Sequence, residues 1–192
     1  MKCTIATMLA ISAFSFPVLA APENYTLDPN HTNITWSANH FGFSNPSGKF
    51  TSVQGTLVLD EAKPENSKVN VTITLAGELS GVPKLDEHLK SDAFFDTAKF
   101  PSATFFSDKV VVTGQNTAKV YGSLTLHGVS KPLTLKIDSF QCQPNPMTHK
   151  EVCGADATAT FDRSDYGVDY GKAYGFKMWV KLEIQVEGSP AG

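Results

Sequence analysis

Apolar and polar residues alternate along most of this sequence, and this alternation is the feature that most constrains its fold. A strand points successive side chains to opposite faces, so that one face can be buried while the other meets water. The pattern predicts eight strands along the chain. We expect them at residues 33–41, 49–60, 68–77, 102–113, 118–127, 132–142, 153–162 and 177–187.

Short segments rich in glycine, proline and asparagine separate these runs, for example Asn45-Pro46-Ser47-Gly48. Connections this short favour antiparallel neighbours, so we expect an all-β fold that is either a closed barrel or a sandwich. An eight-stranded barrel has an interior that side chains can fill or that can hold one small ligand. Small residues on the faces expected to point inward favour a cavity, namely Ala38, Gly55, Gly122, Ala155, Ala157 and Ala159.

The N-terminal residues have the pattern of a targeting signal. A positive start at Lys2 precedes an apolar run over residues 5–16 and the small residues Val18 and Ala20. We therefore expect residues 1–20 to be a signal peptide, cleaved near Ala20/Ala21, and residues 21–192 to form a single domain. No later stretch is apolar enough to cross a bilayer, so we expect no stable membrane insertion.

Charge and cysteine content narrow the function further. The formal net charge of −3 gives no basic field for nucleic acid, so no nucleic-acid partner is expected. Cys142 and Cys153 remain once the signal peptide is removed, and in an exported chain this pair predicts one disulfide; two free thiols are the alternative.

One stretch, residues 85–106, departs from the alternation. Leu85, His88 and Leu89 are spaced by three and four residues, as on one face of a helix, and the paired Phe94 and Phe95 follow. The stretch predicts a short helix near residues 84–95. On physical grounds alone it is an apolar plug among the strands.

Four segments in order, "DPNHTNITWSANHFGFS", "DEHLKSDAFFDTAKFPSATF", "GSLTLHGVSKPLTL" and "FDRSDYGVDY", resemble successive motifs of the YceI-like family of bacterial periplasmic polyisoprenoid-binding proteins. The resemblance runs from about Tyr25 to Glu187. It implies an eight-stranded antiparallel, lipocalin-like β-barrel in the periplasm that holds one long isoprenoid chain, with the short helix at one end of an apolar cavity. The implied ligands are polyprenyl phosphates or prenylated quinones such as ubiquinone, and some members pair as homodimers.

The resemblance and the expected strand faces together assign candidate site residues. The apolar lumen and collar would comprise Trp36, His40, Phe41, Phe43, Leu85, Leu89, Phe94, Phe95, Phe100, Phe105, Leu124, Leu126, Phe161, Met178 and Val180. Candidate head-group contacts are Lys84, His88 and Tyr166. Many members carry arginine where this chain has Leu85, so Lys84 would have to replace that charge. The segment around Asp162 and Arg163 is expected to be a turn that these two residues hold.

Catalysis and metal binding find little support in the sequence. His40, His88 and His127 are not at ligand spacing, and Ser80, Asp86 and His88 lack a nucleophile elbow. We expect no enzyme, no metal and no cofactor apart from a bound isoprenoid lipid. The expected function is that of a periplasmic carrier; the alternatives are an exported enzyme acting on a small apolar substrate, or an interaction protein whose barrel is filled.

Overall fold

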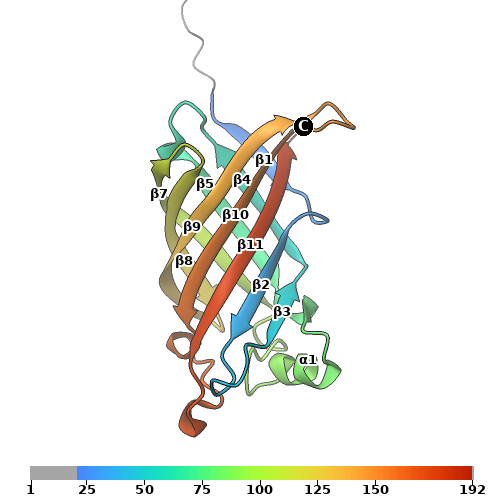
Figure 1. Cartoon of the computed structure of the whole chain (residues 1–192), viewed down its shortest axis with the longest axis vertical. Coiled ribbons are helices and arrows are strands. Elements are labelled where there is room, and N and C mark those ends of the chain that lie inside the picture. Colours follow the sequence, from blue (N-terminus) through green and yellow to red (C-terminus); the bar gives the residue numbers. More distant parts are fainter. Residues whose placement is uncertain (1–20, 192) are drawn as a thin grey trace, which may run out of the picture.

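A computed structural model describes residues 21–191, so the predicted signal peptide at residues 1–20 lies outside the described residues. The chain forms one antiparallel sheet that closes on itself, because β1 pairs with β11 as well as with β4 (Figure 1). The strands are β1 (Glu23–Leu27), β2 (Asn33–Ala38), β3 (Ser47–Phe50), β4 (Val53–Leu59), β5 (Lys68–Thr74), β6 (Glu78–Leu79), β7 (Ser102–Gly114), β8 (Thr117–Leu126), β9 (Val129–Pro144), β10 (Glu151–Asp162) and β11 (Trp179–Pro190).

These elements make up an eight-stranded barrel, because three barrel strands are each interrupted once. The interrupted strands are β1 with β2, β3 with β4, and β5 with β6. The first pair lies beside β11, the second beside the first, and the third beside the second. β7 to β10 follow as neighbours in chain order. The predicted antiparallel barrel is confirmed, and the sandwich is excluded.

The strand predictions are wrong in several places. The predicted strand at residues 49–60 is two strands, β3 and β4, and the one at residues 68–77 ends at Thr74, where a 3-10 helix begins. β1 was not predicted, since Asp28-Pro29-Asn30 forms a turn that separates its short run from β2. The predicted strand at residues 33–41 ends at Ala38, because the chain turns back on itself between His40 and Ser44.

A single α-helix, α1 (Pro83–Lys90), interrupts the strands of the described chain, together with four 3-10 helices at Pro64–Asn66, Leu75–Gly77, Arg163–Tyr166 and Lys172–Tyr174. Proline occupies the first turn of α1, where its missing N–H costs nothing. The helix is shorter than the predicted residues 84–95, because the segment after Lys90 folds back: the amide of Phe95 donates to the carbonyl of Leu89 at 3.0 Å.

The sheet has an edge at β6, beside α1. Among the described strands, β6 pairs only with β3, whereas β7 pairs with β5 and β8. α1 lies next to this end of the barrel (Figure 1). The buried Leu89 anchors it to the core, and the Phe95 ring packs edge-on against Phe50 of β3, with 6.0 Å between ring centroids. Side chains therefore complete the wall where strand pairing stops.

The end of the barrel away from α1 has its own small core of Tyr25, Leu59 and Cys153. The predicted disulfide between Cys142 and Cys153 is present and joins directly opposed residues of β9 and β10. The Tyr25 hydroxyl donates to the carboxylate of Glu151. Burial first, and then this hydrogen bond, raise the pKa of Tyr25 above its usual value. A buried cluster, a disulfide and a side-chain hydrogen bond thus hold this end together.

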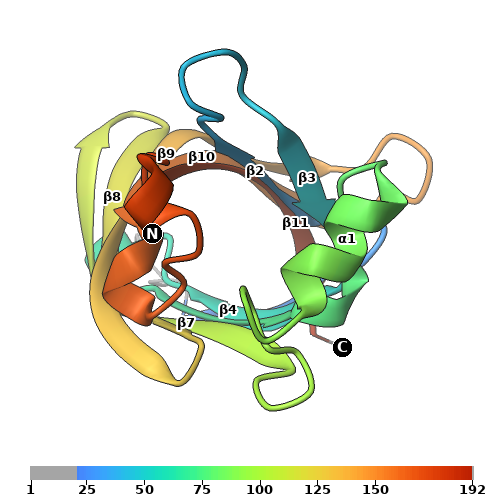
Figure 2. The same ribbon diagram turned by 90° about the horizontal axis from the view of Figure 1, so that it is seen from below.

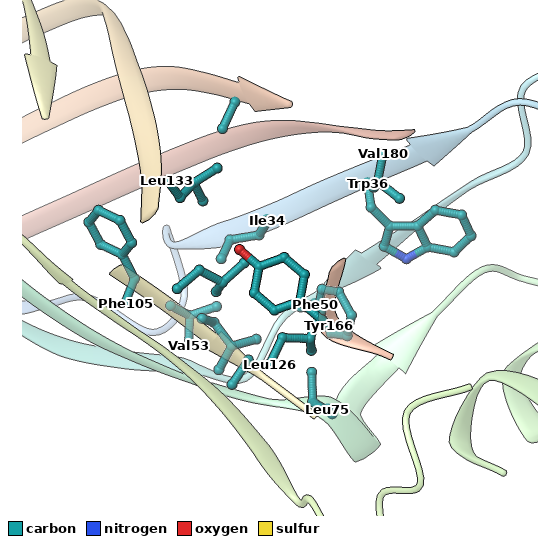
Figure 3. Close-up of a cluster of buried hydrophobic side chains, with 14 of the residues drawn as sticks. Ile34, Trp36, Phe50, Val53, Leu75, Phe105, Leu126, Leu133, Tyr166 and Val180 are labelled. Carbon is teal, nitrogen blue, oxygen red and sulfur yellow. The ribbon is translucent and has the colours of Figure 1, made fainter. Parts of the chain in front are cut away.

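The middle of the barrel is filled by large side chains that pack over small ones. Gly122 of β8 faces inward, as expected, but a Cβ at this position would lie 2.6 Å from Cζ of Phe105. The ring of Phe105 thus occupies the space above Gly122. Figure 3 shows Phe105 and Leu133 on one side of the buried cluster and Trp36 and Val180 on the other.

Substitution of Gly122 tests this packing. Gly122→Ala should lower the free energy of unfolding by about 1–3 kcal/mol, because the added methyl group overpacks the core against Phe105 and the backbone of β7. Gly154→Ala is the matched control, since a Cβ there would be 3.5 Å from its nearest neighbour, an ordinary contact. Urea denaturation of both variants measures the difference; equal stabilities would contradict the packing described.

Removal of the disulfide tests its contribution to stability. The Cys142→Ala/Cys153→Ala double variant should lose about 3 kcal/mol of unfolding free energy, on the loop-entropy estimate for a short loop. Urea denaturation of the wild-type protein with and without a reductant provides the control, because reduction should reproduce most of the loss. An unchanged midpoint in both experiments would show that the bond adds no stability.

Candidate functional site

A cavity of about 600 Å³ lies in the half of the barrel next to α1. Its walls come from the inward faces of seven strands, β2, β3, β5, β7, β8, β10 and β11, and from α1. Figure 2 looks onto this end, where α1 and the segment after β10 lie on different sides of the opening. Because period-two alternation points every second side chain inward, the lining is mostly apolar.

A layer of large side chains in the middle of the barrel forms the floor of the cavity. On β7 the lining includes Ala103 but not Phe105, and on β8 it includes Leu124 but not Gly122. Phe105 is buried and packs with the core cluster of the barrel. The small residue Ala103 therefore leaves space, and two residues further along the same face the large Phe105 ends it.

A cluster of ring side chains and one cation stands at the mouth, and we call His88, Phe94, Arg163 and Tyr170 the mouth cluster. The ring of His88, on α1, lies edge-on to Phe94 and Tyr170, with centroids 4.9 and 4.7 Å away. The guanidinium of Arg163 lies 5.3 Å from the centre of the Phe94 ring, a cation–π distance. All four residues line the cavity. They join α1 to the segment after β10 across the mouth.

Arg163 is held in place by backbone groups. Its Nη1 donates to the carbonyl of Val168 at 2.6 Å, and its Nη2 donates to that of Tyr170 at 2.7 Å. None of the ion pairs among the described residues includes it. Burial lowers the pKa of Arg163, and the charges of Asp162 and Asp169 oppose that shift. A guanidinium has five N–H donors, so a largely buried cation with unused donors faces an apolar cavity.

The local sequence explains how Arg163 reaches this position. Asp162 caps the 3-10 helix by accepting from the amide of Ser164 at 2.8 Å, and Gly167 ends it in the left-handed conformation, with φ of +76°. The prediction of a turn at this position is correct. Sequence reasoning missed the second role of Arg163 at the cavity wall, because a basic residue beside an aspartate suggests a surface ion pair.

The structure brings together most of the residues that were predicted to form the apolar lumen and collar. Those at the cavity wall are Trp36, His40, Leu85, Leu89, Phe94, Phe95, Leu124, Leu126, Phe161 and Val180, together with His88 of the candidate head-group contacts.

Five predicted lumen residues lie elsewhere: Phe41, Phe43, Phe100, Phe105 and Met178. Phe43 is 86% exposed at the tip of a turn. Phe100 packs on His127, with 4.5 Å between ring centroids. Met178, just before β11, is buried on the same face as Val180 but does not line the cavity.

Two candidate head-group contacts, Lys84 and Tyr166, do not line the cavity. Lys84 borders a shallow depression outside α1 and does not line the cavity. Tyr166 is buried edge-on against Phe161, and burial raises its pKa. The additional lining residues Tyr170, Phe176 and Lys177 come from the segment after β10, where irregular backbone leaves no periodicity to identify them.

Of Ser80, Asp86 and His88, the first two are hydrogen-bonded to each other, and they hold the start of α1. The amide of Ser80 donates to Oδ1 of Asp86 at 2.8 Å, and its hydroxyl donates to the same oxygen. The His88 ring instead contacts the mouth cluster. Within residues 21–191, no cluster of three or more His, Cys, Asp or Glu side chains is placed to hold a metal ion. In the same range, no helix is both long and apolar enough to cross a membrane.

Several solved structures share this fold. The Burkholderia cenocepacia protein BcnA superposes with a TM-score of 0.73 at 20% identity, over 84% of this chain and 98% of that one. A Campylobacter jejuni YceI protein has a TM-score of 0.67 at 28% identity, over 80% and 90%. A domain from Saccharophagus degradans, described as polyisoprenoid binding, has a TM-score of 0.64 at 14% identity, over 87% and 98%.

The sequence itself matches more closely related proteins. A UPF0312 protein of Pseudomonas putida strain W619 is 35% identical over 190 residues, which cover 98% of this chain and 97% of the relative. One from Pseudomonas fluorescens strain SBW25 is 37% identical over 172 residues, or 89% and 88%. Residues 25–188 match the family model described as the YceI-like domain, and the chain therefore belongs to the YceI-like family.

Proposed function

We propose that this protein binds one amphiphile with an isoprenoid tail and carries it through the periplasm. The observation that carries the proposal is the apolar cavity of about 600 Å³ with a buried cation at its mouth. The description of the Saccharophagus degradans domain as polyisoprenoid binding supports an isoprenoid tail. The disulfide, typical of an oxidising compartment, supports the periplasm.

The tail would supply most of the affinity. Burial of each CH₂-sized group contributes about 0.8 kcal/mol, so a five-carbon unit contributes roughly 4 kcal/mol before ordering costs. Three such units contribute roughly 12 kcal/mol, which still reaches micromolar affinity after association costs of about 4 kcal/mol. No bond has to be formed or broken for this function, and the mouth cluster needs only to receive a polar head group.

The head group would meet Arg163. Its guanidinium is already positioned by two carbonyls and by the ring of Phe94, so little conformational freedom is lost when a further acceptor arrives. Phosphate and quinone oxygens are both acceptors, and a phosphate gains the stronger, charge-assisted hydrogen bonds. A polyprenyl phosphate or a prenylated quinone such as ubiquinone therefore fits the site.

Filling the cavity tests whether the tail occupies it. Ala38→Phe should lower the affinity for a prenyl ligand about tenfold or more, because the new ring takes up space at the cavity wall. Ser37→Phe is the matched control, since its side chain points to the opposite face of β2, in register with the exposed Ser47 and Lys181. Native mass spectrometry of both variants with added ligand measures the bound fraction; equal occupancy would contradict the placement of the tail.

Substitution of Arg163 tests the head-group role. Arg163→Gln should weaken binding of a prenyl phosphate about 10- to 100-fold, the range for hydrogen bonds to charged groups. It should leave binding of the prenyl alcohol with the same tail nearly unchanged, so the alcohol serves as a control for correct folding. Isothermal titration with both ligands gives the comparison. An equal loss for both would show that Arg163 only holds the segment after β10.

A further inference from the structure

Exposed aromatic side chains gather around the mouth of the cavity. Phe43 is 86% exposed and Tyr174 is 77% exposed, and Phe41 and Tyr170 are exposed to a lesser degree. We call these four residues the aromatic rim. They come from two turns, one between β2 and β3 and one between β10 and β11. Both turns project at the end of the barrel that carries α1 (Figures 1 and 2).

Backbone hydrogen bonds define the turns that carry these exposed rings. Between β2 and β3, the amide of His40 donates to the carbonyl of Ser44 at 2.9 Å, and that of Phe43 donates to His40 at the same distance. Phe41 has a φ of +55°, a left-handed conformation that costs a non-glycine residue about 1–2 kcal/mol. The fold thus tolerates local strain to place two phenylalanines at the tip of a defined turn.

The turn between β10 and β11 is likewise defined by left-handed residues and a backbone hydrogen bond. Gly171 and Gly175 take left-handed conformations on either side of Tyr174, whose amide donates to the carbonyl of Gly171 at 3.0 Å. The two turns touch, because the ring of Phe41 lies 4.1 Å from that of Phe176. Phe176 therefore links the turn of Phe41 and Phe43 to the turn of Tyr170 and Tyr174.

The turn between β2 and β3 has no acidic residue, and the one between β10 and β11 has Asp165 and Asp169, both before Tyr170. No aspartate or glutamate occurs between Asp28 and Asp60, or between Asp169 and Glu183. The exposed Lys172 and Lys177 flank Tyr174. Exposed aromatic rings beside lysines are the composition found where proteins meet the interface of an anionic membrane.

We propose that the aromatic rim docks on the surface of an anionic lipid bilayer and inserts Phe43 and Tyr174 into its interface, with Lys172 and Lys177 facing the head groups. The inference rests on the proposed function, since it supplies the route by which a lipid enters or leaves. Tyr170 and Lys177 belong to the lining of the cavity as well as to this surface. A lipid tail that passes between the bilayer and the cavity would then stay shielded from water by the protein and the membrane.

The test is binding of the chain from Ala21 onward to vesicles of phosphatidylethanolamine and phosphatidylglycerol, measured by flotation. The Phe43→Ser/Tyr174→Ser variant should partition into the vesicle fraction about tenfold less than wild type, because two apolar rings are lost from the interface. Phe106→Ser/Tyr121→Ser is the matched control: both residues are exposed, at 51% and 40%, on strands β7 and β8 of the barrel wall. The control should bind as wild type does.

Two further measurements distinguish failure of the docking surface from failure of the proposed function. Lys172→Glu/Lys177→Glu should reduce binding to these vesicles and not to vesicles of phosphatidylcholine alone. Uptake of a short prenyl phosphate from solution, without vesicles, should be the same for the rim variant as for wild type. Absence of wild-type binding to the vesicles, or an equal loss in the rim variant and its control, overturns the docking surface. Rim-dependent vesicle binding without any ligand uptake overturns the proposed function and leaves the docking surface standing.

Discussion

Pairing of β1 with β11 is the constraint on which the rest of the structure depends. It closes the strands β1, β4, β5, β7, β8, β9, β10 and β11 into a ring, so that no edge remains at the disulfide end of the barrel. Closure also gives every strand an inside and an outside, and period-two alternation then decides which side chains enter the lumen. The cavity, its floor and the position of Arg163 all follow from that enclosed space.

Side-chain size divides the lumen into a filled half and an empty half. Ala103 and Phe105 lie on the same face of β7, two residues apart, and only the smaller one borders the cavity. Gly122 on the neighbouring strand is small because Phe105 lies over it, and it leaves no room for a ligand. A small inward residue can therefore border a cavity, as Ala103 does, or lie beneath a large neighbouring side chain, as Gly122 does.

The regular part of the molecule was predictable from the sequence, and the irregular part was not. Alternation identified the barrel strands and wall residues such as Leu124, Leu126 and Val180, since a period of two fixes a face. Phe43 was placed in the lumen through the resemblance, and nothing in the local sequence shows that a turn beyond Ala38 exposes it. Arg163 was assigned only to a turn, since its contacts with Val168 and Tyr170 depend on how that turn folds back.

The edge at β6 has a mechanical consequence. In a fully paired barrel, widening the wall breaks a row of backbone hydrogen bonds, each of which must then find another partner. Between β6 and β7 the wall is closed by α1 and the turns after it, through side chains such as Leu89 and Phe95. An outward swing of α1 would cost apolar contacts and leave every strand pairing intact. Between β6 and β7 the wall thus depends on side-chain packing, whereas between paired strands it depends on backbone hydrogen bonds.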